Sequence, residues 1–222
     1  EIYSHGWQSI KLYFMIGQPN ETLEDVQAIA DLAKQVIVEG RKTIGKRANL
    51  HVGVSTFVPK PHTPFQWAGL DSLPSVLEKQ NLLKDQLRGP GMKMTWSNPR
   101  ETILEASLSR GDRRLADVIE SAWQHGAKFD AWQDQFNYNV WMDAFDAYGI
   151  KPDFYTSRKR ELNEVFPWDH ISTGVSRKFL EKEYRNSLEG ITTDDCRGNC
   201  YACGILPEFI DLRRENPGNN WL

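Results

Sequence analysis

The chain has 222 residues, of which 40% are hydrophobic and 26% are charged, enough to bury one ordinary core or two small ones. Lysine and arginine number 27 against 30 acidic residues, and the net charge of -3 gives no general electrostatic reason to bind nucleic acid. No apolar run approaches the roughly 20 residues of a membrane span, and no signal-peptide pattern is visible. We therefore expect a cytoplasmic protein without a membrane partner.

A strand, a tight turn and a helix start are predicted over residues 9–25. Apolar residues alternate along 10–16 with side chains that are themselves mostly apolar, a pattern typical of an inner parallel strand that is covered on both faces. Gly17 allows the tight turn, and Thr22 can cap the helix that follows. Loops of this kind hold ligands in α/β enzymes.

A βαβ unit is predicted from these residues and the next strand. Residues 22–39 carry apolar side chains at helical spacing, and Gly40 can end the helix. Residues 50–58 then alternate as a strand does. A strand, a helix and a strand within about 50 residues make a right-handed unit with parallel strands.

The loop that leaves this second strand, residues 59–67, contains three prolines and no regular period. It should be stiff, and it leaves the end of the strand at which α/β folds bind ligands. Stiffness lowers the entropy cost of presenting polar side chains, so Lys60, His62 and Gln66 are candidate substrate-binding residues. The alternative is a structural crossover whose aromatic side chains plug the end of the sheet.

Further helices are predicted downstream. Residues 72–89 and 101–108 should be helices on either side of a short strand or extended piece at 92–96. This unit should end between Gly89 and Gly111. Apolar and aromatic stripes at helical spacing predict three more helices, at residues 113–125, 131–148 and 173–188.

The chain then divides into three parts. These are an α/β unit (1–110), a helical domain (111–190) and a cysteine segment with the tail (191–222). Residues 151–169 should be mostly irregular, and the basic run at 158–160 should be a solvated face.

Three cysteines lie at Cys-x3-Cys-x2-Cys spacing: Cys196, Cys200 and Cys203. An odd number of close cysteines does not make a secreted disulfide framework, whereas three thiolates at this spacing can surround one centre. We expect an iron–sulfur cluster with a non-cysteine or open fourth position. Zinc is the alternative, completed by Asp195 or by a histidine such as His125 or His170. Free or purely structural thiols are a further alternative.

Two segments resemble the radical S-adenosylmethionine (radical SAM) superfamily. FMIGQPNET at residues 14–22 resembles the fifth-strand segment of these enzymes, and HVGVSTFVPKPHTPFQW at 51–67 looks like the sixth strand and its exit loop. Both runs, the C-terminal cysteines and much of the sequence between them are similar to an uncharacterised radical SAM family with an upstream cobalamin-binding-like domain. The resemblance covers nearly the whole chain.

The resemblance implies an incomplete radical SAM (β/α) barrel fragment, followed by a mainly helical C-terminal domain with a cysteine knuckle. The catalytic cysteine motif of the superfamily normally follows the first barrel strand, and four strands do not fit upstream of Ile10. We therefore expect the C-terminal part of a longer protein, whose partner is the missing N-terminal part. That protein would use S-adenosylmethionine and a [4Fe-4S] cluster, and an upstream domain of this kind allows cobalamin.

By resemblance, Gly17 and Glu21 shape the adenine side of the cofactor pocket, and Val58 and Pro59 line it through their backbone. The catalytic residues stay unknown, and the isolated chain should be inactive because the catalytic cluster is absent. The C-terminal cysteines would hold a separate accessory iron–sulfur cluster or zinc. The rival hypothesis is a non-enzymatic zinc-knuckle helical module that binds RNA or a protein partner, although the net charge argues against RNA.

Overall fold

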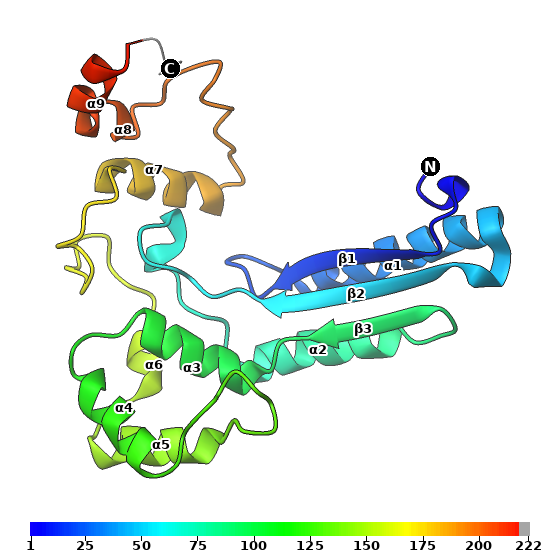
Figure 1. Ribbon diagram of the computed structural model, residues 1–222, viewed down its shortest axis with the longest axis horizontal. Helices are drawn as coiled ribbons and strands as arrows, with labels where there is room; N and C mark the ends of the chain where they lie inside the picture. Colours follow the sequence, from blue (N-terminus) through cyan, green and yellow to red (C-terminus); the bar gives the residue numbers. More distant parts are fainter. Residues whose placement is uncertain (218–222) are drawn as a thin grey trace.

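The computed structural model describes residues 1–217 as a mixed α/β protein with a small parallel sheet (Figure 1). The sheet has the order β1-β2-β3, with β1 at Ser9–Ile16, β2 at Asn49–Thr56 and β3 at Met92–Trp96. Both strand pairs are parallel, and Leu50 pairs with Ile10 on one side and with Met92 on the other. The predicted strands are confirmed, and so is the parallel pairing of the first two.

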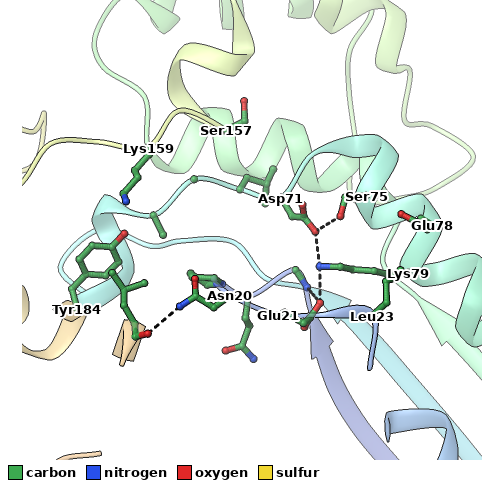
Figure 2. A pocket seen from close by; sticks show the side chains of 17 residues that line it. Asn20, Glu21, Leu23, Asp71, Ser75, Glu78, Lys79, Ser157, Lys159 and Tyr184 are labelled. Atoms are coloured by element: carbon green, nitrogen blue, oxygen red, sulfur yellow. Dashed lines mark hydrogen bonds and ion pairs between the residues drawn. The ribbon is translucent and has the colours of Figure 1, made fainter. Parts of the chain in front are cut away.

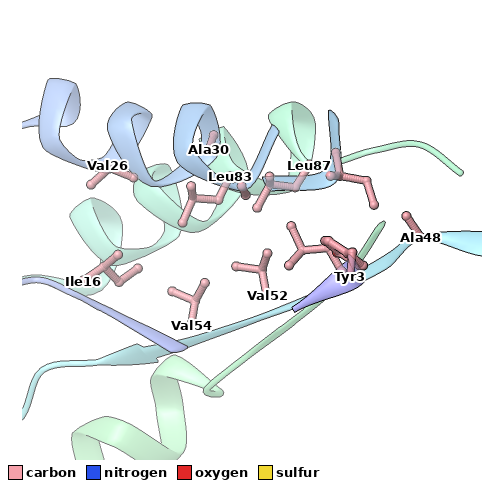
Figure 3. Packing of buried hydrophobic residues seen from close by; sticks show 12 residues of the cluster. Tyr3, Ile16, Val26, Ala30, Ala48, Val52, Val54, Leu83 and Leu87 are labelled. Atoms are coloured by element: carbon pink, nitrogen blue, oxygen red, sulfur yellow. The ribbon is translucent and has the colours of Figure 1, made fainter. Parts of the chain in front are cut away.

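Helices α1 (Leu23–Ile44) and α2 (Leu73–Gln86) connect the strands and lie on one face of the sheet (Figure 1). Thr22 caps α1 reciprocally, since its hydroxyl accepts from the Asp25 amide and the Asp25 carboxylate accepts from the Thr22 amide. Between helices and sheet lies a core of buried apolar side chains (Figure 3), which includes Ile16, Val26, Val52, Val54 and Leu83.

The opposite face of the sheet is uncovered within residues 1–217. Tyr13 is 73% exposed and Met15 is 45% exposed, whereas Ile16 is fully buried. β1 also lies at the edge of the sheet, and β2 is its central strand. The prediction that β1 is an inner strand covered on both faces is therefore wrong for the described chain, because no described element packs over its second set of side chains.

A group of helices lies beside the sheet, at the lower left of Figure 1. It comprises α3 (Pro99–Ser109), α4 (Leu115–Gln124), α5 (Tyr138–Ala147) and the single turn α6 (Pro152–Tyr155). Val118, Ala122 and Phe145 are among its fully buried core residues. The prediction that a helix starts at residue 131 is wrong, because the Asn137 side chain accepts from the amides of residues 139 and 140 and caps α5 there.

The C-terminal part carries α7 (Arg177–Leu188), α8 (Ile205–Glu208) and α9 (Ile210–Glu215), and α7 contacts the 3-10 turn η3 (Pro64–Trp67). Further 3-10 turns are η1 (Tyr3–His5) and η2 (Gly45–Arg47). No helix in the described chain is long and apolar enough to cross a membrane. The C-terminal end of the predicted cysteine segment, residues 218–222, lies outside the described residues.

Candidate functional site

Two cavities lie at the carboxyl edge of the sheet, where parallel α/β folds bind ligands. The loop cavity, of about 500 Å³, lies between the β1–α1 loop, residues 68–79 and the end of α7 (Figure 2). The strand-end cavity, of about 590 Å³, lies over the ends of β1, β2 and β3 and against α3. Each volume is sufficient for a small-molecule ligand.

Lys79 joins two carboxylates in the loop cavity (Figure 2). Its Nζ lies 2.8 Å from Glu21 Oε1 and 2.8 Å from Asp71 Oδ2, and its side chain is 7% exposed. Desolvation alone would lower the pKa of Lys79, but the hydrogen bonds to Asp71 and Glu21 outweigh it, and the pKa is raised. Lys79 therefore stays protonated at neutral pH.

Glu21 also closes the β1–α1 loop. The Gly17 amide donates to Glu21 Oε1 over 2.7 Å, the same oxygen that Lys79 contacts. Gly17 has a φ of 84°, and a Cβ at this position would lie 3.2 Å from the Asp71 Cβ, so a larger residue is strained in both respects. The two residues therefore fix the loop, and Lys159 and Tyr184 line the cavity on the side away from Lys79 (Figure 2).

The strand-end cavity has an apolar side and an acidic side. Met15, Phe57 and Trp96 line it, as do Glu101 and Glu105 of α3. Lys60 forms an ion pair with Glu105. Glu101 Oε1 instead accepts from the neutral Asn98 side chain over 3.1 Å. The cavity is therefore amphipathic and carries more negative than positive side chains.

The four cofactor residues implied by the resemblance do not gather in one cavity. Gly17 and Glu21 line the loop cavity. Val58 lines the strand-end cavity and packs with Leu70, while Pro59 is buried. Glu21 already uses one carboxylate oxygen to hold its own loop, so in this geometry it positions the backbone of the β1–α1 loop.

Of the three substrate-loop candidates, Lys60 alone lines the strand-end cavity. His62 has a φ of 56°, and its Nε2 is buried without a hydrogen-bond partner in the described chain. Gln66 is 3% exposed, and its Oε1 accepts from the Trp168 indole over 2.9 Å and from the His62 amide over 3.2 Å. Gln66 is therefore buried and hydrogen-bonded within the protein, as we expect if this loop is a structural crossover.

Trp67 and Arg110 join the loop at residues 59–67 to the rest of the chain. Trp67 is fully buried, with Phe166 and Tyr184 at centroid distances of 6.0 and 5.7 Å. Arg110 is fully buried and donates to the carbonyl oxygens of Thr156 and Gln66, and desolvation lowers its pKa to about 10.

The expectation that the basic run at 158–160 is a solvated face is wrong for Arg160. Its side chain is 3% exposed and donates to the carbonyl oxygens of Arg110 and Tyr155. Carbonyl oxygens at the ends of helices need donors when they are buried, and Arg160 supplies them at the ends of α3 and α6. The one-dimensional pattern has no signal for such a contact, because its partners come from other segments.

The three cysteines line one further cavity of about 560 Å³. Apolar side chains form much of its wall: Val175, Phe179, Ile205 and Leu206. Within residues 1–217, no three His, Cys, Asp or Glu side chains form a group that could hold a metal ion. The three thiols therefore line one cavity without forming a metal-binding group there, although thiolates are soft donors of the kind that iron–sulfur clusters and zinc prefer.

The surroundings of this cavity narrow the choice of a fourth ligand. Asp195 is engaged by Arg197, whose side-chain and backbone hydrogen bonds lower the pKa of that carboxyl. His125 lies at the end of α4, with its Nδ1 2.7 Å from the Ser121 carbonyl oxygen. Neither lines the cavity, and neither does His170, whereas Glu183 and Asp194 do.

The chain is similar to an uncharacterised protein, MJ0966, of Methanocaldococcus jannaschii, with 32% identity over 115 residues. The matched segment is 52% of this chain and 24% of that protein, so the chain spans about a quarter of the length of the curated relative it matches. No family model and no solved structure matches the chain.

Proposed function

We propose that this chain is the C-terminal part of a radical SAM enzyme, which cleaves S-adenosylmethionine reductively to start radical chemistry on a substrate. The observation that supports this most is the one-sided sheet. Its strands are parallel, its helices cover one face, and Tyr13 and Met15 are exposed on the other. Parallel sheets are usually covered on both faces, and a segment of a (β/α) barrel has this form, with helices outside and the lumen-facing side chains bare.

In this proposal the carboxyl edge of the sheet is the reactive edge. The Glu21–Lys79–Asp71 network fixes the β1–α1 loop, and the stiff segment that follows β2 brings Val58 and Lys60 to the strand-end cavity. The network would position the backbone of the β1–α1 loop beside a ligand, and Lys60 would place a positive charge near it. The full cofactor pocket requires strands from the remainder of the longer protein.

The second part of the proposal is an accessory iron–sulfur cluster at Cys196, Cys200 and Cys203. It is supported by the placement of all three thiols on one cavity with apolar walls. Val175 and Phe179 form part of the apolar wall beside the thiols, of which those of Cys196 and Cys200 are exposed. The Ser176 amide, which donates to the Cys203 carbonyl over 2.7 Å, fixes the loop to the start of α7. When bound, such a cluster supplies one-electron transfer.

Anaerobic reconstitution of the chain with iron and sulfide tests the accessory site. We expect a broad visible absorption band with stoichiometric iron, and the loss of both when the three cysteines are replaced by alanine. Colourless protein with one zinc would instead support the zinc-knuckle module, whose binding to RNA would weaken steeply as salt rises. If neither metal is retained and all three thiols titrate freely in folded protein, there is no metal site.

A further inference from the structure

The strand-end cavity has walls of two kinds, and both are fixed in place. Phe57 on its apolar side packs edge to face on Phe65 with ring centroids 5.2 Å apart, and Lys84 lies 4.1 Å from the Trp96 ring centroid. The acidic side is α3, an eleven-residue helix that presents Glu101 and Glu105 one turn apart. An apolar body with a polar end would match such a cavity.

The acidic side carries one carboxylate that no cation neutralises in the described chain. Lys60 pairs with Glu105. Glu101 accepts a neutral amide hydrogen bond from Asn98 through Oε1, and no hydrogen bond from residues 1–217 reaches its other oxygen. Glu101 lies in the first turn of α3, where the helix dipole favours a negative charge, and its carboxylate can accept a hydrogen bond from a cationic donor.

A buried hydroxyl gives an independent indication of a ligand. Thr56 is 8% exposed and lines the same cavity, and its Oγ1 has no hydrogen-bond partner in residues 1–217. Buried side-chain oxygens in proteins are nearly always hydrogen-bonded. A ligand that donates several hydrogen bonds would satisfy both the threonine oxygen and the free oxygen of Glu101.

We propose that the strand-end cavity binds an organic amine, a molecule with a protonated primary or secondary amino group on an apolar or aromatic body. A protonated amine carries two or three donors and one positive charge, which match Glu101 and the Thr56 hydroxyl. The body would lie against Met15 and Phe57. That this amine is the substrate rests on the proposed function, whereas the binding itself does not.

Calorimetric titration of the chain with 2-phenylethylamine tests the inference, with 2-phenylethanol as a neutral ligand of the same body and phenylacetate as an anionic one. We expect saturable binding of the amine, with the alcohol about tenfold weaker and the acid weaker still. Glu101→Gln should weaken amine binding about tenfold. Glu120→Gln on the exposed face of α4 is the matched control and should leave it unchanged.

A second variant should bind the amine more tightly, which a loss of folding could not cause. Lys60→Gln releases Glu105 from its ion pair and should strengthen amine binding several-fold. Equal affinities for the amine and the alcohol, equal effects of Glu101→Gln and Glu120→Gln, or the absence of saturable amine binding would each overturn the proposal. Thr56→Val, which removes one acceptor, should weaken binding at an unchanged thermal midpoint.

S-adenosylmethionine is itself an amine and is therefore a necessary competitor. If it displaces 2-phenylethylamine and responds to Glu101→Gln in the same way, the cavity belongs to the cofactor and the substrate assignment is overturned, while the proposed function stands. If the longer protein fails to cleave S-adenosylmethionine, the proposed function fails and amine binding by this chain is unaffected.

Discussion

Replacing Lys79 by methionine should strongly destabilise the chain. Methionine keeps most of the volume of the side chain but leaves Glu21 and Asp71 without their shared cation, at side-chain exposures of 9% and 21%. Removing one partner of a buried ion pair costs about 3–5 kcal/mol. The Gly17 amide still donates to Glu21, and Ser75 still donates to Asp71, so we expect the lower end, about 3 kcal/mol.

The contribution of Lys79 to the free energy of unfolding changes with pH in one direction. The pKa of Lys79 is raised in the folded chain, so its contribution to stability is fully present below the pKa of lysine in the unfolded chain, about 10.4, and is lost as the pH rises through the folded value. At neutral pH the variant therefore shows its full deficit. That deficit should shrink as the pH rises through the folded pKa of Lys79, because the unsubstituted chain then loses the same contribution.

Urea denaturation followed by circular dichroism measures this effect. With a slope of about 2 kcal/mol per M, a loss of 3 kcal/mol moves the midpoint down by about 1.5 M. Lys42→Met is the matched control, because Lys42 pairs with Glu39 at side-chain exposures of 65% and 67%; a change below about 0.5 kcal/mol is expected. Equal shifts in the two variants, or a deficit that does not change with pH, would refute the reasoning.

Two further substitutions test other contacts at this edge. Gln66→Ala should lower the free energy of unfolding by about 2 kcal/mol, since it leaves the Trp168 indole and the His62 amide without their acceptor, and a thermal melt measures it. Gly69→Ala should cost at least as much, about 3 kcal/mol, because its Cβ would lie 2.2 Å from the Ser157 carbonyl oxygen; a fall in urea midpoint checks it.

Matched controls exist for both. Gln124 is exposed and donates to Glu120 on the same helix, so Gln124→Ala should change stability by less than about 0.5 kcal/mol. Gly198 has its nearest neighbour for a Cβ at 3.7 Å and no positive φ, so Gly198→Ala should be tolerated. Shifts as large in these controls as in the test variants would contradict the assigned contacts.

The local part of the fold was predictable from the sequence. Alternation along residues 9–16 and helical spacing over residues 22–39 depend on neighbours within a few positions, and the structure has β1 and α1 there. The parallel pairing followed from chain connectivity. The free face of β1 was not predictable, because an apolar side chain such as Met15 does not reveal whether another element covers it.

The candidate site was predicted only in its location. The sequence indicated the loops at the carboxyl edge, and Lys60 does line a cavity there. It gave no sign that Lys79, a helical residue, reaches back to Glu21 across the loop cavity. Arg160 was likewise placed on the surface, because burial of a charge depends on tertiary contacts that one-dimensional spacing does not report.

The formation of 5′-deoxyadenosine is the direct test of the proposed radical SAM activity. The proposed longer protein, reconstituted anaerobically with iron and sulfide, is incubated with S-adenosylmethionine and dithionite, and the product is measured by mass spectrometry. We expect 5′-deoxyadenosine from the longer protein, and from the isolated chain none above the triple-cysteine variant. A longer protein with a full complement of iron–sulfur cluster that forms no 5′-deoxyadenosine would contradict the claim.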